Sequence, residues 1–219
     1  MNKLFLCSDK FSCNSISNFT IEITQRCNFR CKYCCYSGNY SGMRTHSDKS
    51  MSKETIIDSI EFIKKHAHSE DQIVVSFFGG EALLEIDRIV FIIESLNAFF
   101  GERISYDVST NGLLLTDDII KRLLKYDIGI SVSLDGCQEI HDKNRVLPSG
   151  DGTFVNVVNN LLHFKKSYAG EYSKRIRILI TAGSIEDVIV MNNYFDKFEE
   201  LLGDKPLFIS HIYPNFKKG

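Results

Sequence analysis

Two hydrophobic periodicities alternate along this chain. Phe19 to Ile23 alternates apolar and polar residues as a strand does, and residues 73–78 form a short, mostly apolar run that ends at Gly79 and Gly80. An uninterrupted run of this kind is typical of a strand buried on both faces. Between the two strands, Ser52 offers an N-cap to a segment with helical spacing at Ile56, Ile57, Ile60 and Ile63. The first third of the chain is therefore predicted to fold as strand, helix and strand.

The same alternation continues to the end of the sequence. Further strands are predicted at 104–109, 128–134, 175–181 and 207–212. Further helices are predicted at about 86–100, 117–126, 153–165 and 185–202. Six strands that alternate with five helices predict a parallel sheet with right-handed crossovers, as a partial barrel or a doubly wound sheet. In both architectures ligands bind at the carboxyl ends of the strands.

Composition and charge narrow the class of protein. The chain has 219 residues, 43% hydrophobic and 25% charged, which fits one globular domain. We expect residues 1–18 to be an N-terminal extension and residues 19–219 to be the core domain. A net charge of −2 gives no reason to expect a nucleic-acid partner. The apolar runs are too short for a membrane span or a signal peptide, so we expect a cytoplasmic protein without a membrane partner.

The cysteines carry the strongest chemical signal. There are seven, an odd number, and without a secretion signal this argues against a disulfide framework. Cys27, Cys31 and Cys34 follow the first predicted strand at close, fixed spacing. Three thiolates suit an iron–sulfur cluster with one iron left open, or a structural zinc ion with Cys35, a distant histidine or another cysteine as its fourth ligand. The remaining cysteines are predicted to be unligated thiols: Cys7, Cys13, Cys35 and Cys137.

The cysteine spacing, Cys-x3-Cys-x2-Cys with Tyr33 before the last cysteine, resembles the signature of the radical S-adenosylmethionine superfamily. The resemblance implies a partial (β/α)6 barrel that ends after its sixth strand. It also implies a [4Fe–4S] cluster on the three cysteines and S-adenosylmethionine as the second cofactor. In that family the methionine part of S-adenosylmethionine chelates the open iron, and one electron cleaves it to methionine and a 5′-deoxyadenosyl radical. An electron donor such as flavodoxin or ferredoxin is implied as a partner.

Further motifs lie at the predicted strand ends. Gly79-Gly80-Glu81 resembles the family's Gly-Gly-Glu motif, which binds the amino group of S-adenosylmethionine, although Ala82 replaces the usual proline. The run from Ser133 through Arg145 to Phe154 resembles the peptide- and protein-modifying branch, which includes anaerobic sulfatase-maturating enzymes and thioether-forming peptide maturases. The resemblance implies that S-adenosylmethionine is held by Tyr33, Gly79, Gly80, Glu81, Ser109, Asn111, Ser133, Asp135, Arg145 and Ile212.

These observations lead to one function hypothesis with two alternatives. We expect a radical enzyme, an oxidoreductase, that abstracts hydrogen from a peptide or protein side chain. The alternatives are a radical enzyme with a small-molecule substrate and a zinc-stabilised α/β binding module. No catalytic residue is assigned beyond the cluster. Members of this branch usually carry a Cys-rich C-terminal domain with auxiliary clusters, and since no cysteine follows Cys137, we expect this sequence to lack it.

Overall fold

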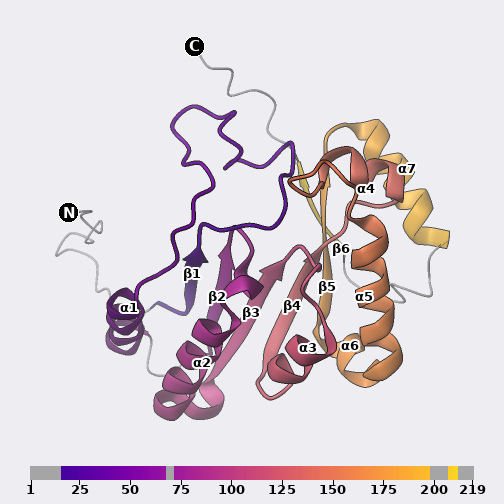
Figure 1. Ribbon diagram of the computed structural model, residues 1–219. Coiled ribbons are helices and arrows are strands. Elements are labelled where there is room, and N and C mark those ends of the chain that lie inside the picture. Colours follow the sequence, from indigo (N-terminus) through magenta and orange to yellow (C-terminus); the bar gives the residue numbers. More distant parts are fainter. Residues whose placement is uncertain (1–15, 68–71, 198–206, 212–219) are drawn as a thin grey trace.

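One parallel sheet organises the molecule (Figure 1). The computed structural model describes residues 16–67, 72–197 and 207–211. The strands are β1 (Asn18–Thr24), β2 (Ile73–Gly79), β3 (Ile104–Thr110), β4 (Ile128–Ser133), β5 (Ile176–Ala182) and β6 (Leu207–His211). They lie in the order β1-β2-β3-β4-β5-β6, and every neighbouring pair is parallel. The predicted α/β fold with six parallel strands is confirmed.

The predicted helices are present, and two short helices were missed. The predicted ones are α1 (Lys53–His66), α2 (Ile86–Phe100), α3 (Asp117–Leu123), α5 (Phe154–Ser167) and α7 (Ile185–Lys197). Ser52 caps α1 as expected, accepting a hydrogen bond from the Thr55 backbone N–H. The missed ones are α4 (Gln138–Asn144) and α6 (Ala169–Arg175), besides the 3₁₀ turns η1 (Ala82–Glu85) and η2 (Gly101–Arg103).

Polar composition explains the missed helices. α6 buries only Tyr172, and an ion pair of 2.6 Å between Arg175 Nε and Glu171 Oε2 supports its last turn. Arg175 was predicted to open a strand, but it ends α6, and β5 begins at Ile176. α4 buries only Ile140 and His141. Seven-residue helices with so little apolar surface give no recognisable periodicity.

The two faces of the sheet differ in character. In β2, Ile73, Val75 and Phe77 are fully buried, whereas Val74, Ser76 and Phe78 are only half-buried. The prediction that this strand is buried on both faces is therefore wrong. Helices pack on the apolar face (Figure 1), and the other face is partly open and carries polar residues.

Some predictions fall near or beyond the limits of the described residues. β1 begins at Asn18, and Ile16 forms an isolated bridge with Ala67, so these residues already take part in the fold. Residues 1–15 and Ile212 lie outside the described residues, and the N-terminal extension stays a prediction there. Of the helices in the described part of the chain, none combines the length and the apolar character that crossing a membrane requires.

Candidate active site at the carboxyl end of the sheet

A cavity of about 600 Å³ opens at the carboxyl ends of the strands. One wall is the loop between β1 and α1, which crosses this end of the sheet in Figure 1 and carries Cys27, Cys31 and Cys34. Strand residues that point to the open face form the floor: Thr20, Ser76, Phe78, Ser109, Ser133 and Thr181. The volume is in the range of small-molecule and cofactor sites. The structure therefore brings the three predicted ligands to one cavity.

Two glycines fix the first half of the cysteine loop. A Cβ atom on Gly79 would lie 2.4 Å from the Thr24 carbonyl oxygen, and one on Gly80 would lie 2.1 Å from that of Arg26. The Glu81 backbone N–H donates to the Arg26 carbonyl at 2.7 Å. Glycine is required here because two backbone segments approach too closely for a side chain. The Gly-Gly pair thus positions the loop that carries Cys27, and both glycines also line the cavity.

The second half of the cysteine loop is held by the segment after α4. The Arg30 N–H donates to the Val146 carbonyl at 2.7 Å, and the Lys32 N–H donates to the Asn144 carbonyl at 2.9 Å. These two bonds lie on either side of Arg145 in the sequence. Consequently Cys31 and Arg145 are held in one backbone framework.

Glu81 is almost entirely buried and fully engaged with the protein. Its carboxylate accepts from the Thr110 hydroxyl at 2.7 Å, from the Asn111 N–H at 2.8 Å and from the Leu83 N–H at 3.0 Å. Burial raises the pKa of this carboxyl, and the hydrogen bonds oppose that rise. Asn111 also donates to the Asn28 side chain at 2.7 Å. Glu81 and Asn111 both line the cavity, and both join the ends of β2 and β3 to the cysteine loop.

Arg145, Asp135 and Tyr33 form a buried polar corner. Arg145 Nε donates to Asp135 Oδ2 at 2.7 Å, and the Tyr33 hydroxyl donates to the same oxygen at 2.5 Å. The Thr181 backbone N–H donates to Asp135 Oδ1 at 2.8 Å. Asp135 is fully buried and does not line the cavity, whereas Arg145 and Tyr33 do. The predicted ligand contact of Asp135 therefore becomes a supporting position behind Arg145.

One edge of Arg145 remains open to the cavity. Arg145 Nε and Nη2 donate to the Asp135 carboxylate. No described residue accepts a hydrogen bond from Arg145 Nη1. The hydroxyls of Ser109 and Ser133, which also line the cavity, have no hydrogen-bond partner among the described residues. A guanidinium edge and two hydroxyls are suitable donors for a carboxylate and a polar ligand.

The motif that follows Ser133 supports this corner from behind. The Asp135 N–H donates to His141 Nδ1 at 3.3 Å, so the opposite nitrogen of a neutral imidazole carries the proton and donates to Thr153 Oγ1 at 3.1 Å. Thr153 in turn donates to the Arg145 carbonyl at 2.8 Å. Burial and the nearby Arg145 lower the pKa of His141 to about 4, so the ring is neutral at pH 7.

Asp142 completes the support at the start of α5. Its carboxylate accepts from the backbone N–H groups of Thr153 at 2.7 Å and Phe154 at 2.9 Å. A Cβ atom on Gly152 would lie 2.4 Å from a carboxylate oxygen of Asp142. The predicted motif from Ser133 to Phe154 is thus a network that fixes the backbone of Arg145.

The cysteines fit a cluster by donor chemistry. Burial raises the pKa of the Cys27 thiol to about 12 and that of Cys31 to about 11, and it also raises that of Cys34, so metal binding must release protons. Among the described residues, no group of three Cys, His, Asp or Glu side chains converges on a point suitable for one ion. A four-iron cluster does not require such convergence, because each cysteine binds a different iron. The three cysteines line one cavity, which is compatible with such an arrangement.

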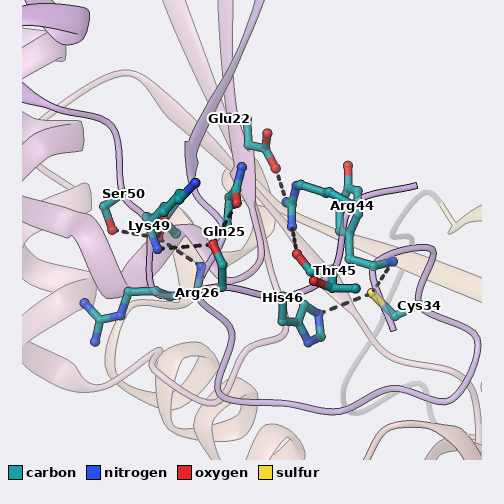
Figure 2. A network of polar contacts seen from close by, with 12 residues as sticks. Glu22, Gln25, Arg26, Cys34, Arg44, Thr45, His46, Lys49 and Ser50 are labelled. Carbon is teal, nitrogen blue, oxygen red and sulfur yellow. Dashed lines mark hydrogen bonds and ion pairs between the residues drawn. The ribbon is translucent and has the colours of Figure 1, made fainter. Parts of the chain in front are cut away.

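Several residues that line the cavity were not predicted from the sequence, among them His46 and Thr181. His46 lies 12 positions after Cys34, and its Nε2 is 3.6 Å from Cys34 Sγ (Figure 2). Thr181 reaches the cavity from the end of β5. No local motif marks His46. Thr181 could have been found from strand alternation, since it stands two residues after Leu179, the partner of Ser133, and therefore points to the same face.

The predicted contact residues are distributed as follows. The cavity is lined by Tyr33, Gly79, Gly80, Glu81, Ser109, Asn111, Ser133 and Arg145. Cys35 also lines it, whereas Cys137 does not. Ile212, Cys7 and Cys13 lie outside the described residues.

Comparison with known proteins places this geometry in a family. Residues 21–189 match the family described as the Radical SAM superfamily. An uncharacterised protein of Methanocaldococcus jannaschii, MJ0907, is 28% identical over 71% of this chain and 50% of its own length. The cysteine-type anaerobic sulfatase-maturating enzyme of Clostridium novyi is 29% identical over 73% of this chain and 42% of its own length. The chain thus spans half or less of these relatives.

A solved structure shares the fold. The chain resembles native anSMEcpe with bound AdoMet and the Cp18Cys peptide at a TM-score of 0.70 and 24% identity, over 89% of this chain and 50% of the other. At this identity the likeness shows the fold alone.

Proposed function

Because this chain belongs to the radical S-adenosylmethionine superfamily, we propose that it binds a [4Fe–4S] cluster through Cys27, Cys31 and Cys34 and S-adenosylmethionine in the adjoining cavity. The superfamily uses these two cofactors together. When both are bound, they supply a one-electron cleavage that yields methionine and a 5′-deoxyadenosyl radical, which takes a hydrogen atom from the substrate. One observation carries the proposal: three thiols share a single cavity with donors suited to a carboxylate. Family membership favours this function over the zinc-stabilised binding module.

Different cavity residues bind different groups of S-adenosylmethionine. The Nη1 edge of Arg145, with the Ser133 hydroxyl, binds the methionine carboxylate, because a guanidinium offers charge-assisted hydrogen bonds. Gly79 and Gly80 admit the ligand's amino group close to the backbone, and Glu81 supplies a negative charge at this wall. Asp135 and Tyr33 orient Arg145.

We assign a peptide or protein side chain as the substrate class. The sequence run from Ser133 to Phe154 resembles that of the peptide- and protein-modifying branch, and a relative of similar sequence is a sulfatase-maturating enzyme. A small acidic redox protein such as flavodoxin or ferredoxin supplies the electron.

Product analysis tests the proposal. The protein is loaded with iron and sulfide without oxygen, and S-adenosylmethionine and dithionite are added. We expect methionine and 5′-deoxyadenosine in equal amounts, and none from the Cys31→Ala variant. A wild-type protein that holds about four irons per chain yet releases neither product would contradict the proposal. Stimulation of the release by small metabolites, and not by cysteine- or serine-containing peptides, would contradict the substrate class.

A further inference from the structure

The three cysteine sulfurs differ in the hydrogen bonds that they accept. The Phe29 N–H donates to Cys27 Sγ at 3.4 Å. Cys34 Sγ has two neighbouring nitrogens, the Tyr36 backbone N–H at 3.4 Å and His46 Nε2 at 3.6 Å. Cys31 Sγ has only its own backbone N–H as a donor among the described residues. His46 is thus the one side chain in the described structure that directs a nitrogen to a sulfur of the predicted cluster site.

The position of His46 is built by its neighbours (Figure 2). Its backbone N–H donates to the Tyr36 carbonyl at 3.0 Å, which joins its segment to the end of the cysteine loop. Arg44 lies over the Tyr36 ring, 3.5 Å from its centroid, and forms an ion pair with Glu22 on β1. These contacts tie residues 44–46 both to the sheet and to the loop that carries Cys34.

His46 also lines two cavities. One is the cysteine cavity, and the other is a smaller one of about 390 Å³ whose other lining residues include Arg26, Arg30 and Asp48. His46 Nδ1 has no hydrogen-bond partner among the described residues. Among the described residues, the imidazole of His46 therefore has a polar contact only at Nε2, which lies beside Cys34 Sγ.

We propose that His46 is a positioning residue that donates its Nε2–H to the Cys34 thiolate and so raises the reduction potential of the cluster. The inference rests on the proposed function, because it needs a cluster on Cys34. A donor to a ligand sulfur stabilises the reduced, more negative cluster more than the oxidised one, and hydrogen bonds to the sulfurs are among the factors that set cluster potentials. Together with the Tyr36 N–H, His46 gives Cys34 Sγ more hydrogen-bond donors than either of the other two sulfurs has.

Redox titration of the loaded protein, followed by electron paramagnetic resonance without S-adenosylmethionine, tests the proposal. His46→Phe removes the donor and should lower the midpoint potential by roughly the equivalent of a tenfold change in the equilibrium constant, about 59 mV for one electron. His46→Gln places an amide N–H near the same point and should recover most of the shift. His163→Phe, at an exposed histidine beside Asp117, is the matched control and should leave the potential unchanged.

A measurement on the wild-type protein covers the case in which His46→Phe fails to hold the cluster. With ¹⁵N-labelled histidine, pulsed electron paramagnetic resonance of the reduced cluster should show a weak coupling to nitrogen. The His46→Gln variant should lose this coupling. An unchanged potential in loaded His46→Phe, or no such coupling in the wild type, would overturn the role of His46. A wild-type protein that binds no cluster at all would instead overturn the proposed function.

Discussion

The two faces of the sheet are built from the same strands and do different things. On the helix-covered face, alternate residues such as Val75, Phe77 and Val108 are fully buried in one continuous core. On the open face, several of the alternate residues are polar and line a cavity, as Ser76 and Ser109 do. Since successive strand residues point to opposite faces, neighbouring positions can be assigned separately to stability and to chemistry. Substitutions on one face should therefore disrupt the fold, and substitutions on the other should disrupt the site.

Adjacent residues of β2 give the largest expected difference. Phe77 is fully buried and stacks on Tyr106, so Phe77→Ala should lower the free energy of unfolding by about 3–5 kcal/mol. Ser76→Ala on the open face should change it by less than about 0.5 kcal/mol. Urea unfolding of the metal-free protein measures both. Equal losses of unfolding free energy at the two positions would contradict the difference between the two faces.

The buried His141 predicts a pH dependence of stability. Its pKa is lowered from 6.5 to about 4 in the folded protein, so the unfolded chain takes up a proton first as the pH falls. The stabilisation is fully present above pH 6.5 and should be lost between about pH 6.5 and pH 4, by roughly 3 kcal/mol. His141→Asn keeps an acceptor for the Asp135 N–H and cannot titrate. Its unfolding free energy should fall less over this range, and a parallel fall in both proteins would exclude His141 as the cause.

Replacing Arg145 should weaken the binding of S-adenosylmethionine without loss of the cluster. Arg145→Ala should weaken S-adenosylmethionine binding by about 1.5–3 kcal/mol, the scale of a charge-assisted hydrogen bond. Calorimetric titration of the loaded variant measures it. Arg122→Ala removes an arginine that pairs with Asp87, away from the cavity, and should bind as the wild type does. An unchanged dissociation constant for Arg145→Ala would make Arg145 a structural partner of Asp135 only.

Strand alternation and helical spacing were sufficient to predict the order of the strands and longer helices. The two missed helices, α4 and α6, have almost no buried apolar residues, so their conformation depends on tertiary contacts. The β2 prediction was wrong because an apolar run does not reveal that one face will line a cavity.

The site was predictable where the chemistry is local in sequence. The cysteine spacing, the Gly-Gly-Glu segment and Arg145 all reach one cavity. The sequence did not reveal that Glu81 and Asp135 are occupied by protein donors, since their partners Thr110 and Thr181 come from other strands. It also did not reveal His46, whose approach to Cys34 depends on the stacking of Arg44 on Tyr36.

In the proposed site, three cysteines hold one cluster and leave one iron open. Cys35 also lines the cavity and is the control that the chain itself provides. Iron and sulfide analysis of the anaerobically loaded protein should give about four of each per chain, and Cys35→Ala should give the same. Cys27→Ala, Cys31→Ala and Cys34→Ala should each lose the cluster. A Cys35→Ala protein that loses its iron as completely as Cys31→Ala would contradict the three-cysteine site.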